Sequence, residues 1–195
     1  MLKRLFDIVF SFFGLILVSP FLLIIAVLIK TQSPGPVFYR GERVGKEGKT
    51  FRIFKFRTMV VDAEKLGGPS TASDDPRLLK IGNFLKKFQL DEIPQLINVL
   101  RGEMSLVGPR PTFRYQVEKY NDFQRKRLLV KPGITGWALI HGRNLLSWEE
   151  RIKYDVWYVE NWSLWLDFKI LLKTIKIVLL RKGLYGEEGI NDPFV

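Results

Sequence analysis

The sequence predicts a mostly helical α+β protein with one membrane-embedded helix at its N-terminus. A long uncharged apolar run comes first, at residues 8–29. An alternating stretch with a glycine-rich turn follows and predicts a small β-hairpin. Segments with helical spacing of apolar residues then continue to about residue 181. We therefore expect a membrane anchor at 1–32 and a folded domain at 33–195, with several amphipathic helices around a site at the membrane surface.

The apolar run at 8–29 is 22 residues long, and one helix of about 20 apolar residues is enough to span a bilayer. Ser19 and Pro20 interrupt this run, and a proline inside a helix is expected to kink it. At about 1.5 Å per residue the two arms are roughly 16 and 14 Å long, so each reaches about half of a ~30 Å hydrocarbon core. The hydroxyl of Ser19 is placed to bond a carbonyl that the proline leaves free.

Basic residues flank the apolar run on both sides: Lys3 and Arg4 precede it, and Lys30, Arg40 and Arg43 are among those that follow. Positive charge favours the cytoplasmic side of a membrane, so both ends are expected on that face. A re-entrant helix that bends in the middle satisfies this expectation. A kinked single span is the alternative, because membranes tolerate proline in spanning helices. The charge pattern favours the re-entrant arrangement and leaves both open.

The later elements follow from periodicity, turn residues and capping signals. Ser147 and Glu150 form a capping-box pattern that predicts the start of a helix. The last helix carries Trp165 and other apolar residues among lysines, which is typical of a helix in a membrane interface; packing on the core is the alternative. The expected elements are strands at 37–43 and 50–56, loops at 62–76 and 131–137, an extended or turned segment at 107–111, and helices at 78–88, 91–101, 113–129, 147–160 and 164–181.

Composition narrows the chemistry. The 195 residues include no cysteine and one histidine, His141, which excludes disulfides, thiolate chemistry and a histidine-rich metal site. The formal net charge of +11 indicates an anionic partner: nucleic acid, an anionic membrane surface or a phosphorylated substrate. Composition alone does not choose among these three.

Two adjacent carboxylates, Asp91 and Glu92, lie in the stretch QLDEIPQL, shortly before Pro94. Because proline is tolerated only in the first turn of a helix, the pair is expected at a helix start. In a structural interpretation Asp91 caps the helix and Glu92 interacts with its dipole. In a chemical interpretation the helix start binds a phosphoryl group, one carboxylate attacks phosphorus, and its neighbour holds Mg²⁺.

Five basic side chains are candidate ligands for phosphate. Lys55 and Arg57 are two residues apart, so they are expected on one face of a strand. Arg110 lies between two prolines that limit its backbone freedom, and arginine suits bidentate phosphate contact. Arg143 follows a glycine, and Lys86 comes shortly before the acid pair. Each alone is better explained as a solvated charge, but together with the acid pair they predict a polyphosphate site.

Five stretches occur together in one order. They are SP at 19–20, FKFRTM at 54–59, LDEIPQLINVLRGEMSLVGPRP at 90–111, KPGITGWALIHGRN at 131–144 and YDVWYVENWSLWLDFKILLKT at 154–174. This set resembles the bacterial sugar transferases, the monotopic polyprenyl-phosphate phosphoglycosyl transferases. The resemblance covers nearly the whole chain, and its central 22-residue motif is the most specific part. Because the chain begins at the membrane helix, we expect the minimal catalytic form.

The resemblance implies transfer of a sugar 1-phosphate from a UDP-sugar to undecaprenyl phosphate, with release of UMP, as the first membrane step of surface glycan synthesis. It implies that Asp91 attacks the β-phosphate, forms a covalent phosphosugar-aspartate and binds Mg²⁺, and that the kinetics are ping-pong. Glu92 is then the second acid. Lys55, Arg110 and Arg143 fall on positions that meet phosphate or nucleotide in this family.

Further expectations come from the same resemblance. Lys86 stands where a basic residue is usual, and the helix broken at Ser19-Pro20 is expected to be re-entrant. The catalytic domain is then expected on the cytoplasmic face of a bacterial inner membrane, with a homodimer compatible. Leu139 departs from the family, in which a polar residue is expected, so the nucleotide or sugar pocket is expected to differ there.

Two other functions compete with this prediction. Asp74 and Asp75 form a possible metal loop, or more simply a turn. As a metal loop they would serve a membrane-bound, Mg²⁺-dependent glycosyltransferase that releases UDP. A basic module that binds nucleic acid without catalysis would instead lose affinity steeply with salt, and it would leave the apolar run without a purpose. We therefore expect no nucleic-acid partner.

Overall fold

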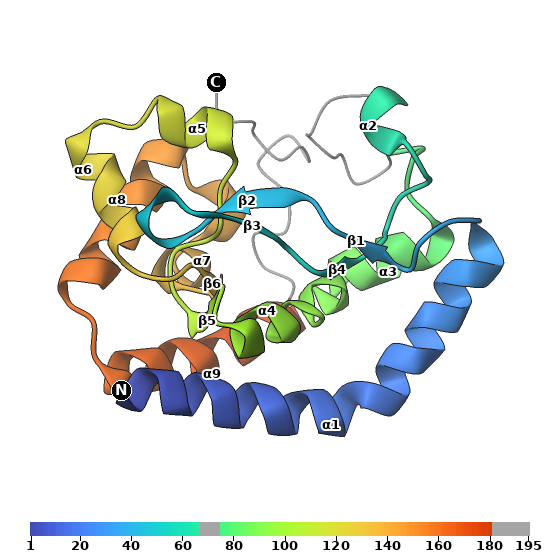
Figure 1. The fold of residues 1–195 in the computed structure, drawn as a ribbon, viewed down its shortest axis with the longest axis horizontal. Coiled ribbons are helices and arrows are strands. Elements are labelled where there is room, and N and C mark those ends of the chain that lie inside the picture. The colour runs from blue at the N-terminus through green and yellow to red at the C-terminus, as the bar shows by residue number, and fades with distance from the viewer. Residues whose placement is uncertain (67–74, 181–195) are drawn as a thin grey trace.

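The computed structural model describes residues 1–66 and 75–180, and helices dominate them (Figure 1). The first helix, α1 (Leu2–Gln32), continues through Pro20, and the Ser19 hydroxyl donates to the Ile16 carbonyl at 2.9 Å. Figure 1 shows α1 changing direction partway along its length, as an internal proline predicts. Of the described helices, α1 alone is long and apolar enough to cross a membrane. Whether it re-enters or spans stays a prediction.

Polar side chains attach the first turns of α1 to the rest of the protein. Lys3 forms an ion pair with Asp167 and also donates to the Val107 carbonyl at 3.1 Å. Arg4 donates to the last carbonyls of α4, including that of Leu100 at 2.9 Å. The buried Asp7 carboxylate accepts hydrogen bonds from β5. The start of α1 is therefore held by polar contacts, in addition to the packing of Phe6 on the main core.

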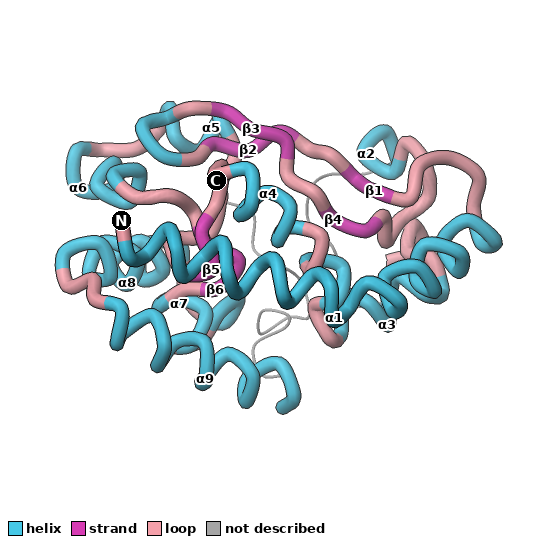
Figure 2. The backbone as a smooth tube through the Cα atoms, turned by 60° about the horizontal axis from the view of Figure 1, so that its bottom comes forward, coloured by secondary structure: helices cyan, strands magenta, loops and turns pink. Residues whose placement is uncertain are grey.

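The outer surface of α1 and of α9 (Leu164–Leu180) is apolar. Both helices lie on the same side of the molecule, and they begin close together at the N-terminus (Figures 1 and 2). A surface this rich in large apolar groups is unusual for a protein in water and is typical of a membrane contact. The exposed side chains include Leu5, Phe10, Phe13, Leu17, Leu23 and Val27 on α1, and Trp165, Phe168, Leu172, Ile175 and Leu179 on α9.

The predicted β-hairpin is confirmed. Strand β1 (Phe38–Tyr39) pairs with β4 (Lys55–Phe56), and β2 (Glu42–Val44) pairs with β3 (Thr50–Arg52), all antiparallel. The two pairs continue one register, and the turn Lys46–Gly48 closes the hairpin. The ladder brings Lys55 out of β4 toward the acid pair.

The predicted helix at 91–101 begins later than expected. Residues Leu90–Glu92 form a 3₁₀ turn, and the α-helix α4 (Gln95–Arg101) starts after Pro94. Pro94 has no N–H to donate to a preceding carbonyl, which disfavours an α-helical turn just before it and suits the start of a helix. The acid pair therefore lies in the turn that joins α3 (Lys80–Lys87) to α4, and the predicted N-cap role of Asp91 is wrong. Gly102, with φ of 82°, ends α4 as predicted.

The predicted helix at 113–129 is wrong as a single element. It divides into α5 (Arg114–Glu118), α6 (Asp122–Arg125) and a 3₁₀ turn, Lys126–Leu129. The cause is Asn121, whose side chain accepts a hydrogen bond from the Gln124 N–H and caps α6. A short helix, α2 (Ala63–Leu66), also lies within the predicted loop at 62–76.

The predicted loop at 131–137 contains a strand. β6 (Gly133–Thr135) pairs in parallel with β5 (Ser105–Val107). The backbones approach closely, because a Cβ on Gly133 would lie 2.1 Å from the Gly108 nitrogen. This pair crosses the core between the hairpin and the last helices (Figure 1).

The C-terminal helices follow the prediction. α7 (Trp137–Ile140) leads to α8 (Trp148–Glu160), and the Ser147 hydroxyl accepts from the Glu150 N–H at its start, as the capping box predicts. α9 ends at Leu180. The main core lies where β3, α4, β5, α8 and α9 meet; its buried members are Phe51, Ile53, Val99, Met104, Leu106, Val107, Tyr158, Leu166 and Ile170.

Candidate active site

The acid pair is buried although both of its members are carboxylates. Asp91 and Glu92 are 8% and 6% exposed, and they lie in the 3₁₀ turn between α3 and α4. Both of these helices pack on α1, and Leu90 packs against the cluster that contains Ile25 and Ile29. Burial of a carboxylate is costly unless partners compensate for the lost water. The partners of each acid therefore indicate its role.

Glu92 is fully paired. Its Oε1 accepts from Lys55 Nζ at 2.8 Å and from Arg110 Nη2 at 2.7 Å. Burial alone would raise the pKa of Glu92, but the charges and hydrogen bonds of Arg110 and Lys55 lower it below its ordinary value. The lowered pKa favours the ionised form of Glu92, which pairs with two cations, Lys55 and Arg110. Glu92 connects the hairpin, through β4, with the loop that follows β5.

Asp91 differs from its neighbour. Among the described residues, none makes a hydrogen bond or ion pair with its carboxylate. Burial, together with the negative charge of Glu92, raises the pKa of Asp91 to about 6, against the charges of Lys55, Lys86 and Arg110. Asp91 is therefore a buried carboxylate with unused acceptor capacity next to a group of cations.

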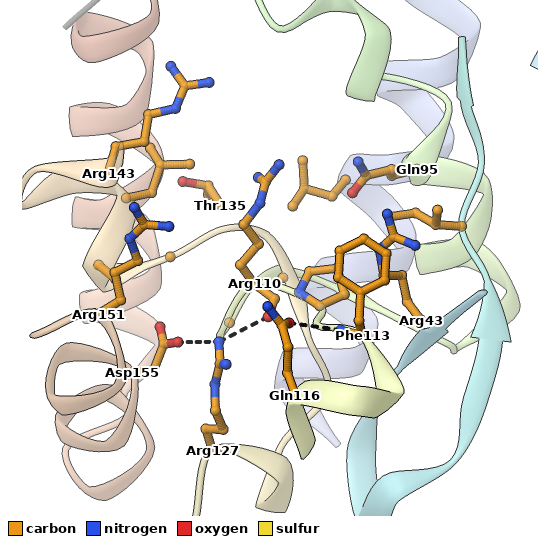
Figure 3. Close-up of a pocket in the computed structure, with 18 of the residues that line it drawn as sticks. Arg43, Gln95, Arg110, Phe113, Gln116, Arg127, Thr135, Arg143, Arg151 and Asp155 are labelled. Carbon is orange, nitrogen blue, oxygen red and sulfur yellow. Dashed lines mark hydrogen bonds and ion pairs between the residues drawn. The ribbon is translucent and has the colours of Figure 1, made fainter. Parts of the chain in front are cut away.

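A cavity of about 290 Å³ opens near the acid pair, although neither Asp91 nor Glu92 is among the described residues that line it. Figure 3 shows part of its wall. Lys55 and Arg110 connect the cavity with the acid pair, because both line the cavity and both form ion pairs with Glu92. Among the described residues of its wall, the one acid is Asp155, which is ion-paired with Arg127. The basic side chains that line it are Arg43, Lys55, Arg110, Arg127, Arg143 and Arg151. This wall fits an anionic ligand that carries more than one charge.

The arginines converge on the cavity from separate elements. Figure 3 shows Arg143 and Arg151 on one side, Arg110 in the middle and Arg43 on the other side. Arg43 stacks on the Phe113 ring, with 3.8 Å from its guanidinium carbon to the ring centroid. The backbone of Arg143 has φ of 57°, an uncommon conformation for a residue other than glycine. Such conformations cluster at functional sites, which supports the predicted role of Arg143 in binding.

The predicted basic residues are not all brought to one place. Lys55, Arg110 and Arg143 line the cavity. Burial lowers the pKa of Lys86, against the attraction of Asp91, so this lysine lies near the acid pair. Arg57 is 6% exposed and donates to the carbonyls of Ser33 and Pro34, and it is not part of the cavity wall. Its side chain holds the end of α1, and its predicted contact with substrate stays a prediction.

The alternative metal loop gains nothing from the structure. Asp75 binds the guanidinium of Arg77 in a fork, which uses both of its oxygens. Asp74 lies outside the described residues. No group of three or more His, Cys, Asp or Glu side chains suited to a metal occurs within residues 1–66 and 75–180. An ion held by one carboxylate and by oxygens of a substrate remains compatible with Asp91.

Sequence reasoning missed several residues of the cavity wall. Arg43 was considered only as one of the basic residues that follow the apolar run. Arg151 lies on the helix that the capping box predicted, but it was not predicted as a site residue. Arg127 and Asp155 come from segments that are far apart in the sequence, and no motif joined them. The one available signal was Asn121, whose capping pattern would have ended α5 early and set Arg127 in a turn facing the core.

Sequence comparisons agree with this geometry. Residues 1–181 match the family described as bacterial sugar transferase, and the chain belongs to that family. It is 45% identical over 183 residues to an uncharacterized sugar transferase, EpsL, of Bacillus subtilis, which covers 94% of this chain and 90% of that protein. The acid pair and the basic cavity are thus parts of a sugar transferase.

Relatives with a stated activity are similar at the same level. An undecaprenyl-phosphate galactose phosphotransferase of Salmonella typhimurium is 43% identical over 94% of this chain. A UDP-glucose:undecaprenyl-phosphate glucose-1-phosphate transferase of Escherichia coli is 43% identical over 95% of it. The chain spans 42% of the length of each of these two proteins.

Proposed function

We propose that this protein transfers a sugar 1-phosphate from a UDP-sugar to undecaprenyl phosphate and releases UMP, through a covalent intermediate on Asp91. The observation that carries the proposal is the contrast between two adjacent buried acids. Glu92 is engaged by Lys55 and Arg110, whereas the Asp91 carboxylate has no hydrogen-bond partner among the described residues. A buried carboxylate left open beside several cations is arranged to meet an electrophile that carries negative charge.

The proposed reaction has two steps at one phosphorus atom. In the first, an Asp91 oxygen attacks the β-phosphorus, and the bond from that phosphorus to the bridging oxygen breaks. The electron pair leaves with the oxygen of UMP. In the second, an oxygen of undecaprenyl phosphate attacks the same phosphorus and releases the Asp91 carboxylate. One phosphoanhydride replaces another, so the protein's task is positioning and charge neutralisation.

The cavity supports the binding of a diphosphate donor. Lys55 and Arg110 lie beside the acids, and Arg143 faces the same space from the segment after α7 (Figure 3). These three cations are suited to the charges on the transferred and leaving phosphates. Because Glu92 fixes the first two, little reorganisation is needed when charge develops.

Mg²⁺ is part of the proposal. The described residues contain no group of three or more His, Cys, Asp or Glu side chains suited to a metal. Mg²⁺ is nevertheless often held by one or two carboxylates together with substrate phosphates, and the open carboxylate of Asp91 fits that mode. When bound, the ion would neutralise phosphate oxygens and so reduce the repulsion between two anions. Lys86 and Lys55 serve the same purpose from the protein side.

The membrane arrangement also belongs to the proposal. The apolar surfaces of α1 and α9 suit a protein that lies in one leaflet, with a re-entrant α1 and the folded domain on the cytoplasmic face. α1 packs on both helices that flank the acid pair, so the phosphate of a lipid at headgroup depth can approach Asp91. A homodimer is compatible with this arrangement.

Intact-protein mass spectrometry tests the proposal. The solubilised protein is incubated with Mg²⁺ and a panel of UDP-sugars without lipid acceptor, beside the Asp91→Asn variant. We expect an added mass of one sugar phosphate in the wild type and none in the variant, and the donor that gives it identifies the sugar. UMP released only after undecaprenyl phosphate is added, with no adduct for any donor, would favour direct transfer. Release of UDP would assign the protein to the alternative glycosyltransferase class.

A further inference from the structure

A buried ion pair supports the cavity from behind. Arg127, in the 3₁₀ turn Lys126–Leu129, and Asp155, on α8, are each 3% exposed. Both belong to the cavity wall, yet their charged groups bind each other (Figure 3). They are thus poorly placed to neutralise a ligand and need another explanation.

The guanidinium of Arg127 serves more than one acceptor. Besides Asp155, it donates from Nη2 to the main-chain carbonyl of Arg110 at 3.1 Å, as Figure 3 shows, and from Nη1 to the Tyr120 hydroxyl at 2.6 Å. The Tyr120 hydroxyl donates in turn to Thr112 at 3.3 Å. The network therefore ends on the loop that carries Arg110.

Main-chain hydrogen bonds hold this loop on either side of Arg110, and the carbonyl of Arg110 itself is bound by a side chain. Two prolines flank Arg110 and contribute no N–H groups. The carbonyl of Pro109 accepts from the Gly133 N–H and that of Thr112 from the Val44 N–H, each at 2.8 Å. The Arg110 carbonyl lies between these two points and is bound by the Arg127 side chain. Arg127 thus fixes the residue whose guanidinium reaches Glu92.

Stability alone is a weak explanation for such a pair. The free energy needed to remove two charges from water offsets much of the attraction between them. Apolar residues packed between the same elements would therefore stabilise the fold at least as well. A second ion pair, Lys126–Glu160, already joins the same turn to α8 on the surface. The feature that the buried pair adds is the directed hydrogen bond to the Arg110 carbonyl.

We propose that Arg127 and Asp155 are positioning residues, which hold the main chain of Arg110 so that its guanidinium stays on Glu92 and beside Asp91. This inference rests on the proposed function, because it assigns Arg110 to the reaction. The pair acts through Arg110 and does not itself touch the substrate. Arg127 needs its planar fork for this purpose, since a lysine cannot bind Asp155, Tyr120 and a carbonyl in one plane.

The test is a double-mutant cycle on the first half-reaction, the rate of adduct formation at saturating UDP-sugar. We expect Arg127→Lys to slow this step by about 10- to 100-fold when Arg110 is present. In an Arg110→Ala background the same substitution should change the rate by less than about 3-fold, because the group it positions is gone. Equal losses in both backgrounds would show that Arg127 supports the fold in general and would overturn the inference.

Two further variants protect the test against unfolding. Tyr120→Phe removes one hydroxyl contact of Arg127 without changing charge, and we expect a smaller loss, about 3- to 10-fold, that also disappears in the Arg110→Ala background. Lys126→Met breaks the surface pair between the same elements and should leave the rate unchanged. A loss in Lys126→Met equal to that in Tyr120→Phe would contradict the proposal.

Failure of the proposed function gives a different result. If Asp91→Asn still forms the adduct, or if the wild type forms none, then the covalent mechanism fails whatever Arg127 does. If the wild type forms the adduct and Asp91→Asn does not, while the cycle is additive, only the positioning role fails.

Discussion

The protein buries carboxylates in two regions and treats them in opposite ways. At the junction of α1 with α9, Asp167 is fully buried and accepts hydrogen bonds from Lys3, Tyr158 and Trp162. In the turn between α3 and α4, Asp91 is nearly as buried and has no such partner among the described residues. The carboxylate in the first region is fully hydrogen-bonded, whereas the Asp91 carboxylate in the second has acceptor positions that no described residue fills.

We propose that this difference separates a structural carboxylate, Asp167, from a reactive one, Asp91. A buried acid with all its acceptor positions filled has little to gain from a ligand, and its removal leaves donors without partners. A buried acid with an open carboxylate is held at a cost to stability, which a fold retains where function requires it. Asp7, bound by the Ser105 hydroxyl and the Leu106 N–H, follows the pattern of Asp167.

The largest expected effect comes from Asp91→Asn. Loss of the attacking carboxylate should lower turnover by about 10⁴-fold or more. The same change should raise the free energy of unfolding at pH 7 by about 1 to 3 kcal/mol. The pKa of Asp91 is raised from its ordinary value of 3.8 to about 6 in the folded protein. At any pH above 3.8, ionisation of Asp91 therefore favours the unfolded state, and asparagine removes this cost. Paired assays of UMP release and of thermal unfolding measure both quantities. A variant that is inactive and less stable than the wild type would contradict the view that Asp91, unlike Asp167, is held at a cost to stability.

The next effect concerns the structural region. Lys3→Met removes the cation that faces the buried Asp167, so the free energy of unfolding should fall by about 2 to 4 kcal/mol. The rate per folded molecule should stay within about 2-fold of the wild type, because no contact of Lys3 reaches the cavity. Chemical denaturation in detergent and active-site titration by adduct mass provide the two measurements. Lys169→Met, an exposed lysine on α9, is the control and should change neither.

The helices were easier to predict from the sequence than the arrangement of the candidate site. The length of α1 follows from an uncharged apolar run, and the start of α8 follows from the Ser147 capping box, both of which are local signals. The acid pair was found for the same reason, because Asp91 and Glu92 are adjacent. The residues alone left capping and chemistry both open; the family resemblance favoured the chemical role, which stays a prediction.

The remaining site residues meet only in three dimensions. The parallel pairing of β5 with β6 brings Gly133–Thr135 beside Ser105–Val107, and no local pattern within 131–137 shows this. The sequence also could not show that Lys55 and Arg110 share one acid, or that Arg127 holds the loop of Arg110. Arg57 was expected on one strand face with Lys55, but its guanidinium donates to the carbonyls of Ser33 and Pro34 and lies outside the cavity wall, and its contact with substrate stays a prediction. Tertiary contacts decide such cases.

A third prediction sharpens the comparison within the cavity. Arg143→Ala should raise the KM for the UDP-sugar by about 10-fold, because a charge-assisted hydrogen bond to phosphate contributes about 1.5 kcal/mol or more. The rate at saturating donor should change by less than about 3-fold. The described cations that bind the acid pair directly are Lys55 and Arg110, whereas Arg143 lines the cavity. Initial rates of UMP release over a range of donor concentrations separate the two constants. Lys46→Ala, on the hairpin turn, is the matched surface control. A fall in the saturated rate with KM unchanged would assign Arg143 to the chemical step.

The smallest effect, a shift in pH dependence, is the most direct measure of the open acid. Asp91 attacks only when ionised, and its pKa is about 6, so the rate of adduct formation should fall as the pH decreases through this value. Burial and the charge of Glu92 both raise this pKa. Glu92→Gln removes the second cause, so the acid limb should move to lower pH, by roughly half a unit to one unit. The measurement omits the lipid acceptor, whose phosphate also titrates, and uses a His141→Gln background so that the chain's one imidazole does not contribute. A limb that stays fixed in Glu92→Gln would mean that the group controlling the rate is not the acid beside Glu92.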